Sequence, residues 1–308
     1  SPGRSTRAVG PGSSGQGGTS GHLAGHLMIP SGADAGQMVQ RHFRGYVPAH
    51  YDPSCPTPLV LMLPGHRVAV DPLADYTQLM ATADVNDFIV VFAEQEFRDD
   101  LRWAWWTDWS WSQRPNASEH PDLIFLEGLI EHFSARYNID RSRVVVSGHS
   151  RGASMSLIAA LERPDLFSAA VIESGFTEFD YEQRILGRDG PPVALVFIHG
   201  VDDPDVCIDC APGARCAATG RSCGQIYGSD ALVELLLDRG WDETNLRYDR
   251  LPAVAHRWQP QLNQSWWDFV NARPIGGGTD DTSLTEPTAD WPTEAAFDVE
   301  ERSAIAPD

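Results

Sequence analysis

The chain has 308 residues, 42% of them apolar, and a formal net charge of −20 at pH 7. This length is enough for one large hydrophobic core, and the acidic charge argues against nucleic acid or an anionic membrane surface as a partner. The sequence contains no lysine, which excludes a P-loop, a pyridoxal Schiff base and a Ser-Lys dyad. It also has no HExxH zinc motif and no run of roughly 18–20 apolar residues, the length that spans a membrane.

The two ends of the chain differ in composition from the middle. Residues 1–21 are rich in Gly and Ser, which predicts a flexible linker. Residues 275–308 hold nine acidic residues and one Arg, which is typical of a disordered acidic tail. We therefore expect one folded unit over 22–274. The linker-like start without an initiator Met fits a chain whose leader has been removed, so we expect a bacterial-type exported protein, secreted or held at the cell surface.

Seven short apolar segments in the middle region predict β-strands. The central ones are almost continuously apolar, as expected for parallel strands that are buried on both faces. Helix-period segments lie between several of them, for example Leu126, Leu129, Ile130 and Phe133. This alternation predicts an α/β fold with a mostly parallel sheet flanked by helices. The expected strands are 42–48, 58–65, 87–95, 142–150, 166–175, 191–200 and 245–251.

The segment VVVSGHSRGASMS places Ser150 between Gly148 and Gly152, after an expected strand and before a helix of small residues. A Ser in such a tight turn has a strained backbone, and glycines two residues to either side let strand and helix approach closely. The pattern predicts Ser150 as the nucleophile of an α/β-hydrolase.

Chain order restricts the other catalytic groups, because in this fold the acid and then the histidine follow the serine. Two histidines follow Ser150, and His199 ends an apolar strand too early to be the base, which leaves His256. The acid is expected in the loop after the penultimate strand. By position the candidates are Asp202, Asp203 and Asp205, with Glu173 at the end of the preceding strand as a weaker rival.

The sequence resembles the secreted poly(3-hydroxybutyrate) depolymerase and feruloyl/acetylxylan esterase family of α/β-hydrolases over about residues 22–273. The family's acid loop, HG-x-x-D-x-x-V, falls on Asp203. Its histidine pattern, GH-x-W, falls on His256, with Ala255 in place of the Gly. The matching segments are RHFRGYVPAHYDPSCPTPLVLMLPG, FIVVFAEQ, HPDLIFLEGLIEHFSARYNIDRSRVVVSGHSRGASMS, HGVDDPDV and AHRW.

The resemblance also implies how the site works. The backbone N–H groups of His66 and Arg151 should form the oxyanion hole, and no metal or organic cofactor is needed. The first loop departs from the family's LHG and reads LPG, a form similar to that of polyester-cleaving cutinases. The implied partner is an ester or polyester substrate, and we expect a monomer. The resemblance does not choose between polyhydroxyalkanoate, feruloylated or acetylated polysaccharide, and an aromatic polyester.

A segment unusually rich in tryptophan, DLRWAWWTDWSW, follows the third expected strand. It could form an aromatic wall for an apolar acyl group or a polymer chain, or it could pack the loop onto the domain. Trp258, beside His256, is a second possible wall. The candidate substrate-binding residues are Trp103, Trp105, Trp106 and Trp258.

Four closely spaced cysteines follow the candidate acid loop. Their spacing, C-x2-C-x5-C-x6-C, partly resembles a structural zinc site, but the second half lacks the usual C-x2-C. For an exported enzyme two disulfides are the better prediction, although the pairing cannot be deduced from spacing, and Cys55 is either free or bonded to one of the four. The disulfide candidates are Cys207, Cys210, Cys216 and Cys223.

The leading hypothesis is therefore a serine carboxylesterase or depolymerase that acts through Ser150, Asp203 and His256. A non-catalytic polymer- or carbohydrate-binding protein on a hydrolase fold is the alternative from another class. A peptidase is weaker, because the resemblance points to esters.

Overall fold

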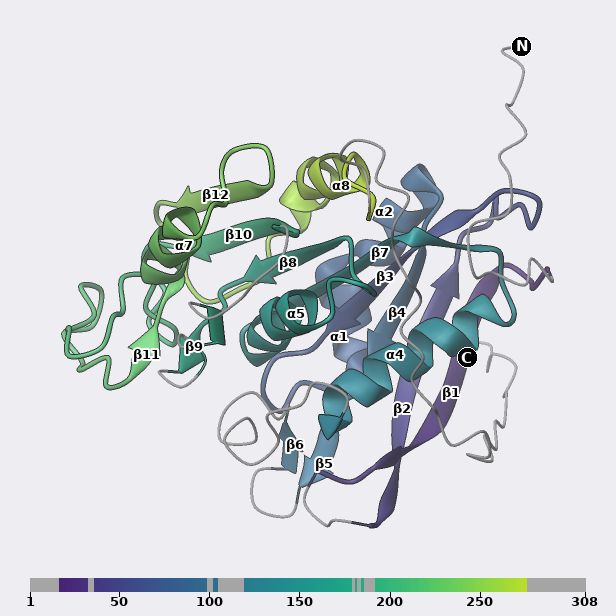
Figure 1. Ribbon diagram of the computed structural model, residues 1–308, viewed down its shortest axis with the longest axis horizontal. Helices are drawn as coiled ribbons and strands as arrows, with labels where there is room; N and C mark the ends of the chain where they lie inside the picture. Colours follow the sequence, from purple (N-terminus) through teal and green to yellow (C-terminus); the bar gives the residue numbers. More distant parts are fainter. Residues whose placement is uncertain are drawn as a thin grey trace.

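An eight-stranded sheet forms the centre of the molecule (Figure 1). The structure is a computed structural model and describes residues 17–32, 36–98, 102–104, 119–178, 181, 184–185 and 192–275. The strand order is β1-β2-β4-β3-β7-β8-β10-β12; β2 is antiparallel to both of its neighbours, and all other neighbouring pairs are parallel. The strands are β1 Gly21–Pro30, β2 Met38–Val47, β3 Thr57–Leu63, β4 Ile89–Ala93, β7 Ile139–His149, β8 Ala169–Glu173, β10 Ala194–Gly200 and β12 Leu246–Leu251.

All seven strands predicted from the sequence are present in this sheet. The additional strand, β1, is an edge strand that pairs only with β2, so most of its residues are partly exposed and it lacks a continuous apolar run. Two short two-stranded antiparallel sheets were also not predicted, because strands of two or three residues carry too little periodicity. They are β5 Glu96–Arg98 with β6 Arg102–Ala104, and β9 Thr177–Glu178 with β11 Ile226–Tyr227.

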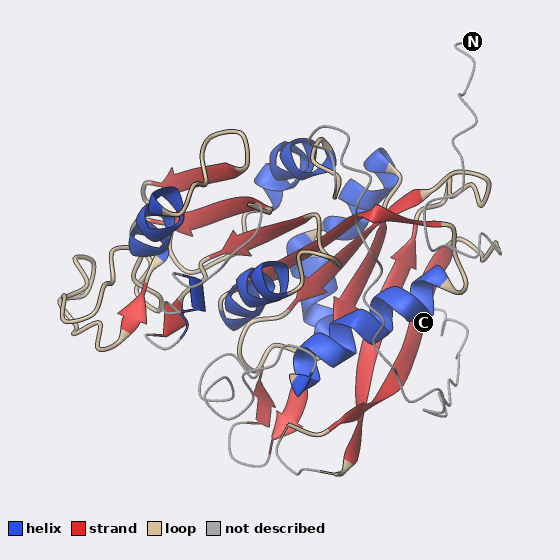
Figure 2. Cartoon of the chain, viewed as in Figure 1, coloured by secondary structure: helices blue, strands red, loops and turns tan. Residues whose placement is uncertain are grey.

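Helices cover both faces of the sheet (Figures 1 and 2). The helices α4, α5 and α7 pack on one face, while α1, α2 and α8 pack on the other. This arrangement confirms the predicted α/β-hydrolase type of layering. The bounds are α1 Val70–Thr77, α2 Leu79–Asn86, α4 Pro121–Ser134, α5 Arg151–Glu162, α7 Ser229–Asp238 and α8 Asn263–Asn271, with a 3-10 turn at Pro260–Leu262.

The central strands are apolar because both of their faces are buried. In β3, Leu59, Leu61 and Leu63 belong to the core beneath α4 and α5, whereas Val60 and Met62 belong to the core beneath α1 and α8. Side chains alternate along a strand, so a strand between two helical layers has apolar residues at nearly every position. Across the described residues, none of the helices combines the length and apolar character needed to cross a membrane.

The parallel strands β3, β7, β8, β10 and β12 all end at the same edge of the sheet. The loops after β3, β7, β10 and β12 carry the residues singled out from the sequence. Ligand sites of open α/β sheets form at this edge, because strand ends and helix N-termini converge there.

Candidate active site

Ser150 lies in the turn between β7 and α5. Its φ of 57° and ψ of −122° lie outside the regions that residues with a side chain normally adopt. The backbone N–H of Ser150 donates a hydrogen bond of 2.9 Å to the carbonyl of Glu173, at the end of the neighbouring strand β8. These angles confirm the strained turn that the spacing of glycines predicted.

The two flanking glycines permit the close approach of strand and helix. A Cβ atom at Gly148 would lie 2.3 Å from the backbone of Gly152, and one at Gly152 would lie 2.2 Å from the carbonyl oxygen of Leu63. Either side chain would have to displace backbone atoms. The two glycines therefore fix where Ser150 sits relative to the end of β3.

His256 and Asp203 form a hydrogen-bonded pair at the same sheet edge. His256 Nδ1 lies 2.7 Å from Asp203 Oδ2. The other carboxylate oxygen, Oδ1, accepts the backbone N–H groups of Asp205 and Val206, both at 2.9 Å. Burial by itself would raise the pKa of Asp203, but hydrogen bonds from His199, His256 and Val206 outweigh it and hold the pKa well below its ordinary value. Asp203 is thus a completely buried carboxylate, while the side chain of His256 is 16% exposed.

His199 is a second histidine that contacts Asp203. Its Nε2 lies 2.9 Å from the Val206 carbonyl and 3.2 Å from Asp203 Oδ2, and its Nδ1 lies 2.7 Å from the Ser229 hydroxyl. A carbonyl can only accept, so Nε2 carries the proton. Sequence reasoning excluded His199 as the base but did not find this supporting position. The HG that precedes the acid loop is the signal that could have indicated it.

His149, the residue before Ser150, contacts His256. The two ring centroids lie 4.6 Å apart. Burial and the nearby His256 lower the pKa of His149 to about 3, so His149 is neutral over the range in which esterases work. A neutral neighbour does not oppose a positive charge on His256.

Tyr76, at the end of α1, is a second residue that sequence reasoning missed. Its ring centroid lies 6.0 Å from that of His149, and its hydroxyl oxygen accepts the backbone N–H of Trp258. Tyr76 is nevertheless 40% exposed. It is an exposed aromatic ring next to a side chain that contacts His256.

The loop after β3 passes beside Ser150. A Cβ atom at Gly65 would lie 3.2 Å from Ser150 Cβ, and the next residue, His66, is one of the two expected oxyanion donors. The other, Arg151, is the first residue of α5, and its guanidinium lies over the ring of Phe176 at 4.8 Å. The Pro64 of LPG is buried.

The structure changes the interpretation of the tryptophans that were expected to bind substrate. Trp258 is 2% exposed, packs in the core beside α8 and donates its indole N–H to Asn263 Oδ1 at 3.1 Å. The predicted substrate contact of Trp258 is therefore wrong, because its ring fills the hydrophobic core. The backbone of Trp103 lies in β6, while its side chain and all of Trp105 and Trp106 lie outside the described residues.

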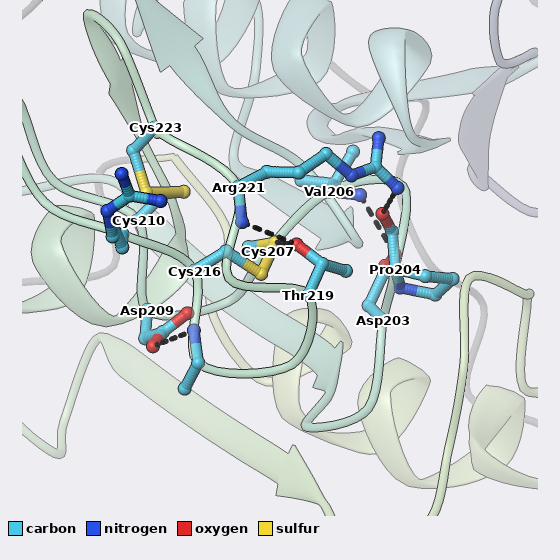
Figure 3. Close-up of a disulfide and its surroundings, with 12 residues drawn as sticks. Asp203, Pro204, Val206, Cys207, Asp209, Cys210, Cys216, Thr219, Arg221 and Cys223 are labelled. Carbon is cyan, nitrogen blue, oxygen red and sulfur yellow. Dashed lines mark hydrogen bonds between the residues drawn. A yellow bond between two sulfur atoms is a disulfide. The ribbon is translucent and has the colours of Figure 1, made fainter.

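The cysteines after the acid loop form two disulfides, Cys207–Cys216 and Cys210–Cys223 (Figure 3). This confirms the disulfide prediction, and Cys55 is free. A disulfide sulfur has no thiolate to offer a metal, so the zinc interpretation of the four-cysteine spacing is not retained. The cysteine-rich insertion, residues 207–223, also contacts the acid loop, because the Arg221 guanidinium donates to the Pro204 carbonyl at 3.0 Å (Figure 3).

Glu173, the rival acid, is a buried residue at the end of β8, beside His149 of β7 in the parallel register. Burial raises its pKa well above the ordinary value, and the nearby backbone of Gln259 opposes this only in part. The structure places the hydrogen bond to His256 on Asp203 rather than on Glu173.

The raised pKa of Glu173 predicts a pH-dependent cost to stability. The folded chain holds the Glu173 proton more tightly than the unfolded chain does. The free energy of unfolding is therefore highest below the unfolded pKa of about 4.3. It falls by about 1.4 kcal/mol per pH unit as the pH rises toward the folded pKa. We expect Glu173→Gln, which is isosteric and uncharged, to flatten the fall in unfolding free energy between pH 5 and 8. Urea unfolding across this range measures it. Glu243→Gln, at an exposed position, is the control, and equal slopes for the two variants would contradict the prediction.

The sheet order, the strained serine turn and the histidine–carboxylate pair define the chain as an α/β-hydrolase. Residues 38–272 match the esterase family described as "Putative esterase". The chain therefore belongs to this esterase family, and it is a carboxylic ester hydrolase. No curated protein sequence matches it.

Solved structures with the same fold include several esterases. A thermostable esterase has 21% identity and a TM-score of 0.55; the match covers 81% of this chain and 62% of that one, less than two thirds of its length. The acetyl xylan esterase from Aspergillus awamori has 14% identity and a TM-score of 0.58, covering 74% and 94%. The S-formylglutathione hydrolase from Agrobacterium tumefaciens has 15% identity and a TM-score of 0.57, covering 85% and 98%. At these identities the likeness concerns the fold.

Proposed function

We propose that the protein hydrolyses esters through Ser150, His256 and Asp203, by way of an acyl-enzyme. The observation that carries this proposal is the 2.7 Å hydrogen bond between His256 Nδ1 and Asp203 Oδ2. It forms at the sheet edge where Ser150 follows the buried strand β7, and His149 beside Ser150 contacts the His256 ring. A nucleophile, a base and an acid that orients the base are the groups that acyl transfer requires.

The reaction proceeds in two matching halves. His256 Nε2 takes the Ser150 hydroxyl proton as Oγ bonds to the ester carbonyl carbon, and the C=O electron pair moves to the oxygen. The backbone N–H groups of His66 and Arg151 bind this oxyanion, an effect worth about 3–4 kcal/mol per donor. Collapse expels the alcohol, which takes the proton from His256. Water then repeats the steps on the acyl-enzyme, while Asp203 stays ionised and stabilises the imidazolium.

The proposed substrates are a polyester of the polyhydroxyalkanoate type, or the feruloyl and acetyl esters of a plant polysaccharide. The exposed ring of Tyr76 supports this choice, because it offers apolar surface beside the His149–His256 pair. Two disulfides support an oxidising compartment, and with it a secreted or cell-surface enzyme. An aromatic polyester is the alternative suggested by the LPG loop.

Replacing Ser150 with Ala is expected to lower kcat for p-nitrophenyl butyrate by about 10⁴- to 10⁶-fold, because the nucleophilic oxygen is lost. Steady-state kinetics measure this, and mass spectrometry after addition of a fluorophosphonate should show one adduct in the native protein and none in the variant. Ser265→Ala, at an exposed position of α8, is the control and should keep full activity. Equal turnover by Ser150→Ala would exclude this mechanism, whereas a native protein that turns over no substrate above the uncatalysed rate would favour a binding function on the hydrolase fold.

A panel of polyhydroxybutyrate film, methyl ferulate, acetylated xylan and an aromatic polyester separates the proposed substrates. Product release measured for the native protein and for Ser150→Ala gives the enzyme-dependent rate on each.

A further inference from the structure

We propose that Gln95 is a positioning residue for the oxyanion hole. The inference rests on the proposed function, in which the backbone N–H of His66 binds the oxyanion. Gln95 follows β4, two positions after its last residue, and it is 1% exposed. Gln95 is the last residue of the matching segment FIVVFAEQ, but neither the residues nor the resemblance assigned it a role.

The Gln95 side chain binds the backbone of the LPG loop. Its amide nitrogen, Nε2, donates to the Pro64 carbonyl at 3.2 Å and to the Gly65 carbonyl. A carbonyl oxygen can only accept, so the amide group is oriented with its nitrogen toward the loop. A buried amide that uses its donors on two consecutive carbonyls holds their peptide planes in place.

The second of these carbonyls belongs to the peptide unit that contains the proposed donor. The Gly65 C=O and the His66 N–H are in one peptide bond, which is planar and trans, so they point in opposite directions. A donor that fixes the Gly65 carbonyl on one side therefore fixes the direction of the His66 N–H on the other. The hydrogen bond also polarises the peptide and strengthens its N–H as a donor.

Contacts on both sides place this peptide against the nucleophile. A Cβ atom at Gly65 would lie 3.2 Å from Ser150 Cβ, and one at Gly152 would lie 2.6 Å from the Pro64 carbonyl oxygen. The Val68 N–H also donates to the Gly65 carbonyl, at 3.1 Å, and closes a tight turn. Of the contacts described here, those of Gln95 are made by a side chain, so a substitution can remove them.

Loss of Gln95 should weaken transition-state binding more than substrate binding, because full negative charge on the oxygen exists only near the tetrahedral intermediate. Gln95→Met removes both donors from a side chain of similar length. We expect kcat for p-nitrophenyl butyrate to fall about 10- to 100-fold while KM changes less than about threefold, since misdirecting one oxyanion donor costs less than deleting it. Affinity for an alkyl trifluoromethyl ketone, which forms a tetrahedral adduct on serine, should fall by a similar factor.

Gln95→Glu gives a second readout that a purely structural role would not produce. An ionised carboxylate repels the two carbonyls, whereas a protonated carboxyl can donate to one of them. The ratio of variant to native kcat should therefore rise as pH falls through the pKa of the introduced acid, which burial places above about 4.3. This variant also serves if Gln95→Met does not fold.

Ser168→Ala is the matched control. Ser168 is buried and donates its hydroxyl to the Val144 carbonyl at 3.1 Å, at the opposite edge of the sheet. Its loss should lower urea stability and leave kcat and ketone affinity unchanged. If Ser150→Ala is inactive but Gln95→Met keeps native kcat and ketone affinity, the role of Gln95 is overturned and the proposed function stands. Full turnover by Ser150→Ala overturns both.

Discussion

Replacing Asp203 with Asn is expected to lower kcat about 10⁴-fold, with little change in the fold. Asp203 Oδ2 accepts the proton of His256 Nδ1, and Oδ1 is held by two backbone N–H groups. An amide has one oxygen, which those backbone donors would retain. Its NH2 group would then face Nδ1 and favour the tautomer with the proton on Nε2, the atom that must accept from Ser150. Steady-state kinetics on p-nitrophenyl butyrate measure the loss.

Asp202→Asn and Asp205→Asn are the controls for this prediction. Each removes one negative charge from the same loop, but both residues are exposed, and their carboxylates are not the partner of His256. Both variants should keep kcat within a few-fold of the native value. A loss of several orders of magnitude in either one, with Asp203→Asn active, would show that the acid is assigned to the wrong residue.

Removing the Cys210–Cys223 disulfide by Cys→Ser at both positions is expected to lower the free energy of unfolding by about 3 kcal/mol. The bond closes a loop with a sequence separation of 13 and is buried with its partner disulfide in a small cluster. The unfolded chain gains conformational freedom when this loop opens. We also expect kcat to fall, because the same insertion holds the Pro204 carbonyl next to Asp203. Urea unfolding and kinetics on the oxidised protein measure the two effects.

Cys55→Ser is the matched control, because Cys55 is a free, partly buried cysteine far from the insertion in the chain. Its effect should stay within about 0.5 kcal/mol, as for most substitutions outside special features. Equal stability of the double variant and Cys55→Ser would show that the insertion contributes nothing to the global fold. Unchanged kcat in the double variant would show that it does not hold the acid loop.

The part of the fold that the sequence predicted is the part built from local patterns. Strands such as β3 and β10 are buried on both faces, so nearly all of their residues are apolar and the segment is visible without any knowledge of its neighbours. The strained turn at Ser150 is equally local, because two glycines within four residues determine it. Chain order then limited the base to His256, and the family pattern favoured Asp203 among the acids of its loop.

The features that the sequence did not predict share a physical cause, because each depends on residues far away in the chain. The edge strand β1 is ordered by pairing with β2 and lacks a continuous apolar run. Trp258 was expected to contact substrate, yet its ring is buried in a core cluster with residues of β3, β4 and α1, which lie far away in the chain. The positions of Tyr76 beside His149 and of Gln95 beneath the LPG loop depend on elements that meet only in the folded chain.

The sequence by itself determined the fold class, the nucleophile turn and the order of the candidate catalytic groups, because these follow from hydrophobic periodicity and from short spacings. Only the tertiary structure decided which cysteines pair, which carboxylate faces His256 and what supports each of these groups. Those outcomes depend on distances between residues that are far apart in the chain, such as Tyr76 and Trp258, which form a hydrogen bond although they lie 182 positions apart. Spacing along the chain does not encode such distances; the packing of two helical layers on one twisted sheet does.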